Sequence, residues 1–454
     1  MSSLLLAGGR VVDPANDFDQ TADVLVEGGK INSIGSDAGK GVGSDVERID
    51  CAGKVVCPGL IDMHVHLREP GGSAKETLET GTQAAARGGF TTVVCMPNTS
   101  PAIDSPGTVA LVKEKAEKQA EVNVLITGTI SKGASGEQLA PIGSLNQAGI
   151  VAITDGENCV QNNELMRRAL EYAAMFDLPV LDHCQENSLV TDGVIHEGYW
   201  SAVLGLRGWP AEGEEMIVAR NILLAERTGC HVHCQHISAA GSVRLLREAK
   251  QRGVPVSAET CPQYFVLTDT AIAGSDRFWE EDGNGIHGYA DLENPPTWPK
   301  YDTMLKTNPP VRSAADRDAI LEGLVDGTID AITSDHSPHC DYEKEVEFDY
   351  APFGMTGLET ELALSLMQLV HSDRLSLPKL IEKFTTNPAR ILRENRGSLS
   401  PGAVADITVI DPQAKWQLTT DNTRSKSDNS PFLGWPLRGR ATRTIVGGRT
   451  VWSD

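Results

Sequence analysis

The sequence lacks any pair of cysteines at the Cys-x-x-Cys spacing, and its nine cysteines are an odd number. In a chain of 454 residues this pattern argues against both a disulfide framework and a cysteine-rich zinc site. We therefore expect reduced thiols that are mostly buried, as Cys95 is expected to be within Thr-Val-Val-Cys-Met-Pro. None of the cysteines is assigned a catalytic role.

Basic residues are also scarce: the chain has 40 basic and 62 acidic residues, so its formal net charge is −22. Such a charge opposes binding to nucleic acid or to an anionic membrane surface. No apolar run approaches the ~20 residues of a membrane span, and the first residues lack the basic start of a signal peptide. We therefore expect a cytoplasmic protein that binds a small molecule.

The chain is longer than a domain with a single hydrophobic core usually is, and its pattern of apolar and polar residues changes along its length. Residues 1–57 and 393–454 alternate short β-rich runs with Gly, Asp and Asn, which predicts one small β-sandwich domain built from both ends. Residues 58–392 alternate apolar, β-branched runs with helical stretches, which predicts an α/β domain.

Eight apolar runs in this middle region predict the eight strands of a (β/α)8 TIM-like barrel. They lie near residues 58–66, 90–98, 122–130, 150–155, 178–184, 231–238, 254–261 and 331–339, and helical periodicity is clearest over 74–87, 163–174, 213–227 and 242–252. A doubly wound open sheet is the alternative, but it does not need eight strands, and no Gly-x-Gly-x-x-Gly follows the first one.

The first of these runs ends in His64, His66 and Arg68. Alternate residues of a strand share one face, so the two imidazoles could hold one divalent metal ion. The guanidinium would then lie beside the ion, where it could bind a substrate carboxylate. On its own a His-x-His spacing is weak evidence, because short motifs often occur by chance on surface strands.

Polar residues follow the other predicted strands at the same end. They are Asn98, Asp155, His183, His236, Asp335 and His339. Active sites of barrels lie at the carboxyl ends of the strands, so one site is predicted to gather histidines and aspartates from several strands. For such a ligand set Zn²⁺ is the favoured ion, with other first-row metals as alternatives.

Several longer motifs make the chain resemble the bacterial class I dihydroorotases of the metal-dependent cyclic amidohydrolase superfamily. The motifs are Asp62-Met-His-Val-His-Leu-Arg-Glu-Pro-Gly71, Ala84-Ala-Ala-Arg-Gly-Gly-Phe-Thr-Thr-Val93, Met96-Pro-Asn-Thr99, Asp182-His-Cys184, Cys234-Gln-His-Ile-Ser238, Asn308-Pro-Pro-Val-Arg312, Asp330-Ala-Ile-Thr-Ser-Asp-His-Ser-Pro-His339, Ala351-Pro-Phe-Gly354 and Asn387-Pro-Ala-Arg390. They cover almost the whole chain.

The resemblance implies reversible cyclisation of N-carbamoyl-L-aspartate to dihydroorotate, a step of pyrimidine biosynthesis, with one or two Zn²⁺ ions. It implies that His64, His66 and Asp335 hold one ion, that His183 and His236 hold a second, and that Asp155 bridges them. Asp335 would also carry the proton from the attacking water to the leaving ring nitrogen. Arg68, Asn98 and His339 would bind the substrate carboxylate, and Asn308 with the backbone of Phe353 and Gly354 would bind the ring amide. A homodimer and a complex with aspartate carbamoyltransferase are further expectations.

Two segments keep other interpretations open. Glu259-Thr-Cys-Pro-Gln-Tyr264 is closer to dihydropyrimidinases, hydantoinases and allantoinases, which is the runner-up function. Residues 275–304 exceed the length of a barrel connection and predict either a lid or a tolerated surface insertion. A non-catalytic partner of aspartate carbamoyltransferase is a minor alternative, since such chains commonly lose metal ligands and this one has all six.

The remaining histidines and one lysine are given structural interpretations. His231 and His233 are expected to pack in the core or at the bottom of the barrel. We expect His196, His287 and His371 on the surface, and Lys132 as a solvated loop charge.

Overall fold

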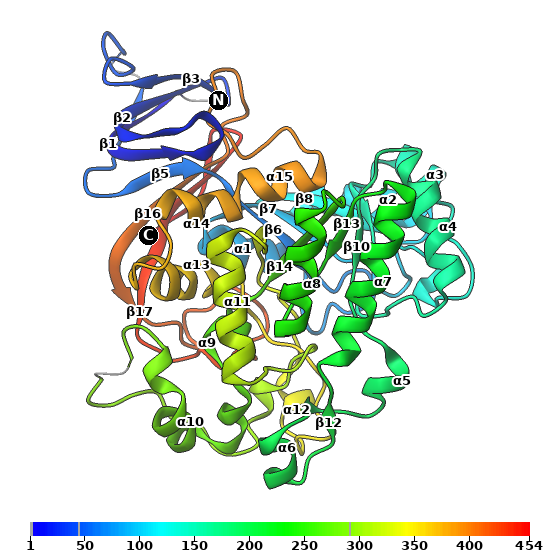
Figure 1. Ribbon diagram of the computed structural model, residues 1–454. Helices are drawn as coiled ribbons and strands as arrows, with labels where there is room; N and C mark the ends of the chain where they lie inside the picture. Colours follow the sequence, from blue (N-terminus) through cyan, green and yellow to red (C-terminus); the bar gives the residue numbers. More distant parts are fainter. Residues whose placement is uncertain (1–2, 44–45, 290–291) are drawn as a thin grey trace.

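The computed structural model describes residues 3–43, 46–289 and 292–454 (Figure 1). Its larger part is an eight-stranded parallel sheet in the order β15-β14-β13-β10-β9-β8-β7-β6. The strands are β6 (Leu60–Val65), β7 (Phe90–Cys95), β8 (Asn123–Gly128), β9 (Ala152–Ile153), β10 (Val180–Asp182), β13 (Val232–Cys234), β14 (Val256–Thr260) and β15 (Ala331–Ile332). A parallel bridge between Val65 and His336 joins the two edges, so the predicted barrel is confirmed, and each strand lies within one predicted run.

Helices surround this barrel, and the four predicted helical stretches are all present (Figure 1). The longer helices are α1 (Leu78–Gly88), α2 (Pro106–Gln119), α3 (Ile142–Ala148), α4 (Asn163–Ala174), α7 (Glu212–Thr228), α8 (Ala240–Gln251), α11 (Ala314–Asp326), α14 (Leu377–Phe384) and α15 (Thr386–Leu392). Local sequence sets their ends. For example, α1 begins after a capping box at Thr77 and is capped at its C-terminus by Gly89, whose φ of 96° favours glycine.

Shorter helices and one two-stranded ribbon lie in the loops between barrel elements. They are α5 (Asn187–Val190), β11 (Ile195–His196), α6 (Tyr199–Leu204), β12 (Gly208–Trp209), α9 (Pro262–Val266), α10 (Ser275–Glu281), α12 (Asp341–Lys344) and α13 (Glu361–Ser365). All nine cysteines are free, and only Cys340 is not fully buried, as the sequence predicts.

The two chain ends form the expected small β domain, whose strands belong to one hydrogen-bonded sheet. The strands are β1 (Leu4–Asp13), β2 (Phe18–Glu27), β3 (Lys30–Gly35), β4 (Glu47–Asp50), β5 (Val55–Pro58), β16 (Ile407–Trp416), β17 (Leu437–Val446) and β18 (Arg449–Ser453). Strand β5 joins the halves because it pairs with β1 on one side and with β16 on the other. Leu6, Val24 and Ile407 are among the side chains of its own buried core.

Residues 417–436, between β16 and β17, leave this sheet and pack on the barrel. The Ser425 hydroxyl donates to Glu76 at 2.5 Å, and the backbone N–H of Arg424 donates to Glu359 at 3.0 Å. Asn429 is buried against the loop that follows β15. The C-terminal part of the chain therefore reaches the barrel as well as completing the sheet.

The long segment 275–304, of which 290 and 291 lie outside the described residues, is anchored by aromatic rings. Trp298 stacks on Trp435 with ring centroids 5.6 Å apart, and Tyr289 meets Trp435 edge-on at 5.0 Å. The Trp298 Nε1–H also donates to the carbonyl of Ala271 at 2.8 Å. These contacts favour a fixed structural element over a mobile lid.

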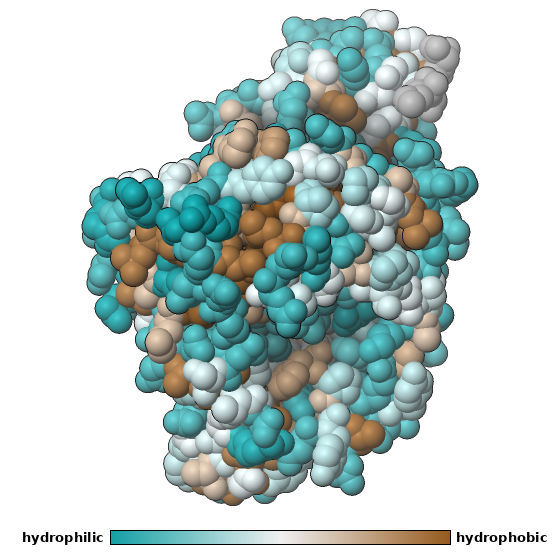
Figure 2. Space-filling view, turned by 90° about the vertical axis from the view of Figure 1, so that its right-hand side faces the viewer, coloured by the Kyte–Doolittle hydropathy of each residue, from teal (hydrophilic) through white to brown (hydrophobic). Residues whose placement is uncertain are grey.

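The surface of the molecule is largely hydrophilic on one side. Seen from the side that carries α3 and α4, most residues are hydrophilic, and apolar residues gather near the middle of that face (Figure 2). Within the described ranges, no helix combines the length and the apolar character that a membrane crossing needs.

Replacing Trp435 tests the anchoring of this segment. Trp435 is 1% exposed within the aromatic cluster, so Trp435→Ala should lower the free energy of unfolding by about 3 to 5 kcal/mol. Urea unfolding followed by circular dichroism measures this change. Tyr350→Ala, at a side chain that is 80% exposed, is the control and should change stability by less than about 0.5 kcal/mol. Equal stability of the two variants would contradict an anchored segment.

Candidate functional site

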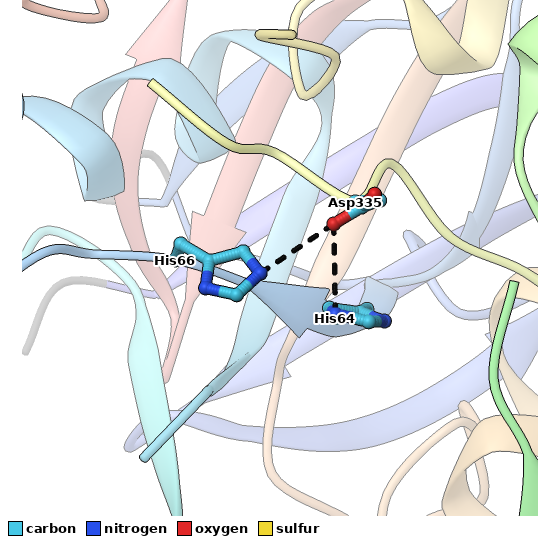
Figure 3. A group of neighbouring side chains, drawn as sticks. All are labelled: His64, His66 and Asp335. Carbon is cyan, nitrogen blue, oxygen red and sulfur yellow. Dashed lines mark ion pairs between the residues drawn. The ribbon is translucent and has the colours of Figure 1, made fainter. Parts of the chain in front are cut away.

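The site begins where β6 ends and the chain after β15 passes beside it. His64 and His66 point from β6 toward Asp335, and both Nε2 atoms lie 3.5 Å from the same Asp335 oxygen (Figure 3). All three side chains are buried, and one ligand atom from each lies within 4.8 Å of the others. Two ligands of one tetrahedral zinc ion stand about 3.3 to 3.5 Å apart, so this group fits a divalent metal ion.

The other nitrogen of each histidine is held by a neighbouring side chain. His64 Nδ1 lies 3.0 Å from Glu259, and His66 Nδ1 lies 3.0 Å from the Asn98 side-chain oxygen. Such contacts fix the ring orientation of metal-binding histidines. They leave His66 Nε2 buried without a hydrogen-bond partner, as expected for an atom that faces an ion.

Charges around His64 oppose one another. Burial lowers the pKa of His64, but Asp335 and Glu259 outweigh this effect and raise it to about 9. Burial likewise raises the pKa of Asp335, yet His64 and His66 lower it well below its usual range, so this carboxyl is ionised. A metal ion must therefore compete with a proton for His64 Nε2, and its binding releases that proton.

His183 and His236 form a second buried pair beside the first. His183 Nδ1 lies 2.7 Å from His236 Nε2, and the rings of His64 and His236 are 5.2 Å apart. Burial lowers the pKa of both His183 and His236, so both are neutral, which is the form that binds metal. His236 Nδ1 is buried without a partner.

The Asp155 carboxylate is held by three hydrogen bonds. One of its oxygens accepts the backbone N–H groups of Ile130 and Ser131 at 2.8 and 2.9 Å, and the other accepts the Ser131 hydroxyl. Burial raises the pKa of Asp155 to about 6. Its expected role as a bridging ligand stays a prediction, and its present contacts are with the loop after β8.

The pocket over the metal-binding residues contains several of the predicted substrate-binding groups. It is lined by His64, Glu157, His183, His236, Asn308, Asp335, Ser337, Phe353 and Gly354. The side-chain oxygen of Asn308 is buried there without a partner, so it is available to a ring N–H. Asn98, Arg68 and His339 are not among the lining residues, and the Asn98 oxygen is engaged by His66.

Arg68 and His339 lie together beside this pocket. An Arg68 nitrogen is 3.3 Å from His339 Nε2, and the Arg68 Nε–H donates to the Pro338 carbonyl at 3.2 Å. His339 Nε2 also lies 2.9 Å from the carbonyl of Phe353. Burial, Arg68 and Lys75 lower the pKa of His339 to about 3, so this imidazole is neutral and adds no positive charge.

Comparison with known proteins shows to which family the chain belongs. Residues 53–242 match the Dihydro-orotase-like family model, and residues 303–452 match the Amidohydrolase family model. The chain is 49% identical over 451 residues to a dihydroorotase of Pelotomaculum thermopropionicum and 47% identical over 450 residues to one of Geobacter metallireducens; each alignment covers 99% of both chains. The chain belongs to the dihydroorotase family.

Solved structures of related enzymes share the whole fold. An L-hydantoinase (dihydropyrimidinase) of Arthrobacter aurescens superposes with a TM-score of 0.85 at 26% identity, covering 100% of this chain and 96% of its own. A D-hydantoinase of a Bacillus species gives a TM-score of 0.81 at 26% identity, covering 99% and 95%. This family member is a hydrolase of cyclic amides, and its His-His-Asp group agrees with the metal dependence of amidohydrolases.

Sequence reasoning missed two carboxylates and an amide at the site. Glu259 points into the barrel from β14, where it also lies 3.0 Å from His233 Nε2. Glu157 lines the pocket, and Asn429 comes from the far C-terminal part. Alternation along β14 could have indicated Glu259, whereas no local signal marks Asn429.

The other histidines differ in how well the sequence placed them. His233 is fully buried in the barrel, and His287 is exposed, as predicted. His196 is not a surface residue, because its side chain is only 12% exposed and lies 3.3 Å from Arg312. His371 is partly buried, and Lys132 is an exposed loop charge as predicted.

Replacing Asn98 tests the support of His66. Asn98→Ala removes the contact to His66 Nδ1, and the loss of such a partner should weaken metal affinity about 10- to 100-fold. Competition with a chelator, followed by elemental analysis, measures it. Asn158→Ala, an exposed amide in the loop after β9, should retain wild-type affinity. Unchanged affinity in Asn98→Ala would mean that His66 needs no such support.

Proposed function

We propose that this protein catalyses the reversible interconversion of N-carbamoyl-L-aspartate and dihydroorotate with Zn²⁺ at His64, His66 and Asp335. The observation that carries the proposal is that the Arg68 guanidinium lies beside this group, 3.8 Å from Glu157, which lines the pocket. The family membership supports the same substrate. His183 and His236 are proposed to hold a second ion.

When bound, the metal activates water and polarises the scissile carbonyl. Asp335 is ionised and faces His64 and His66, so it can take the proton of the attacking water. As the carbon–nitrogen bond of the ring breaks, Asp335 gives that proton to the leaving nitrogen. The carbonyl carbon becomes a carboxylic acid, whose remaining proton passes to solvent and leaves a carboxylate. Ring closure follows the same steps in reverse.

The substrate is proposed to lie with its carboxylate on Arg68, Asn98 and His339. Its ring amide would meet the unpaired oxygen of Asn308 and the backbone of Phe353 and Gly354. Because His339 is neutral and lies against Arg68, it can orient the guanidinium without adding charge.

The hydantoinase-like motif after β14 has a structural explanation. Glu259 holds His64 and His233, and the Tyr264 hydroxyl donates to the Pro309 carbonyl at 2.8 Å, next to Asn308. These residues contact the residues of the site but do not line the pocket themselves. The motif therefore does not favour hydantoin over dihydroorotate.

Domain boundaries and assembly are further parts of the proposal. We place the barrel at 58–392 and the β domain at 1–57 and 393–454, in agreement with β5 ending at Pro58 and β6 beginning at Leu60. A homodimer is proposed from the resemblance alone, as is association with aspartate carbamoyltransferase. Light scattering of the protein, alone and with that transferase, tests both.

Replacing Arg68 tests the substrate. Arg68→Met should cost dihydroorotate about 2 to 5 kcal/mol in kcat/KM, the range for removing one partner of a buried charge pair. Dihydrouracil, which lacks the carboxylate, should lose much less. Arg168→Met, at an exposed helix position, is the control. Faster wild-type turnover of dihydrouracil, hydantoin or allantoin than of dihydroorotate would move the protein to the hydantoinase group.

Replacing Asp335 tests the proton transfer. Asp335→Asn keeps the size of the side chain but removes the base, so kcat should fall at least about 10²-fold. Steady-state assays with zinc-saturated protein measure the loss, and elemental analysis shows whether the ion is retained. Asp192→Asn, at an exposed carboxylate, should be fully active. A near-normal kcat for Asp335→Asn would show that another group moves the proton.

A further inference from the structure

Because Asp155 is engaged by hydrogen bonds, it is not available as a carboxylate ligand for a metal ion at His183 and His236. Both Asp155 oxygens already accept hydrogen bonds, two from backbone N–H groups and one from Ser131. Moving this carboxylate to a metal would leave the buried N–H groups of Ile130 and Ser131 unsatisfied, which is costly. In this structure Asp155 therefore stabilises the loop after β8 through these hydrogen bonds.

Charge balance requires a second anionic ligand if two ions bind. Two divalent ions bring four positive charges into a buried pocket, and the four histidines are neutral ligands. Asp335 alone compensates one charge. Burial of the remainder without a counter-charge is strongly unfavourable, so another carboxylate is expected nearby.

Glu157 is the other carboxylate among the residues that line the pocket. Its Oε1 lies 4.0 Å from His66 Nε2, a little beyond the separation of two ligands of one tetrahedral ion. Glu157 also lines the same pocket as His64, His183 and His236, so it lies near both pairs.

The Glu157 side chain is free to move toward the histidines. Its contacts to Asn98 and Arg68 are long, at 3.4 and 3.8 Å, and its side chain is 48% exposed. It follows Gly156, whose φ of 63° turns the chain after Asp155 so that the two carboxylates face different ways.

We propose that Glu157, and not Asp155, supplies the carboxylate that joins the His64–His66 pair to the His183–His236 pair through the metal ions. This inference rests on the proposed function for the presence of two ions. The inference also has a consequence for substrate binding. When the Glu157 side chain turns toward the metal ions, it moves away from Arg68, and the guanidinium becomes available to the substrate carboxylate.

The test measures metal binding without substrate. Wild type, Glu157→Gln and Asp155→Asn are saturated with Zn²⁺, dialysed and analysed for zinc per chain. Manganese-loaded samples are examined by electron paramagnetic resonance for coupling between two ions. We expect two zinc ions and a coupled signal in wild type and in Asp155→Asn. We expect Glu157→Gln to retain one ion, to bind a second at least 10-fold more weakly, and to lose the coupling.

Several results would overturn the inference. They are a wild type that binds one ion, a Glu157→Gln variant that keeps two coupled ions, and a loss of the second ion in Asp155→Asn. Because Asp155 is buried, Ser131→Ala serves as a milder change that loosens Asp155 without touching a histidine; it should keep both ions. Metal content is independent of the substrate, so inactivity toward dihydroorotate would refute the proposed function and leave this result standing.

Discussion

The site depends on one buried carboxylate, that of Glu259, inside the barrel. Burial raises the pKa of this group, but its contacts with His233 and His64 outweigh the effect and lower it to about 2. An ionised carboxylate is stable there only because two imidazoles share it. His64 is thereby fixed with its other nitrogen toward Asp335, and the position of the metal-binding group follows.

Strained backbone conformations at the ends of the barrel strands orient the side chains of the site. Arg68, His236 and Asp335 follow three different strands and have φ values of 58°, 35° and 47°. Non-glycine residues in this region cost about 1 to 3 kcal/mol each, and such strain is found at functional sites. The barrel hydrogen bonds offset it, among them the one from His66 N–H to the His336 carbonyl at 2.9 Å. A closed sheet can hold these conformations because neighbouring strands leave no room to relax.

Much of the fold could be predicted because it follows from local patterns. The barrel strands lie within the predicted runs and most of them are buried, and His64 and His66 share a face because side chains alternate along β6 and the residue after it. The direction of a side chain at a strand end is different, since it depends on the turn that follows. The contacts of Asp155 illustrate this, because its carboxylate accepts N–H groups of the loop after β8 and Gly156 turns the chain directly after it. Likewise, His196 is partly buried by residues far along the chain, among them Arg312, which lies 3.3 Å from its ring.

The C-terminal part explains why the β domain cannot be regarded as a mere cover. The Asn429 side-chain oxygen accepts the His339 N–H at 2.9 Å, and its amide nitrogen donates to the carbonyls of Ser337 and Gly354 at 3.2 Å each. One buried amide thus joins the loop that carries Asp335 and His339 to the loop that carries Phe353 and Gly354. Since residues 417–436 lie between β16 and β17, the sheet that pairs the two chain ends also holds this amide in place. The small domain therefore contributes to the distance between the metal-binding residues and the groups proposed to bind substrate.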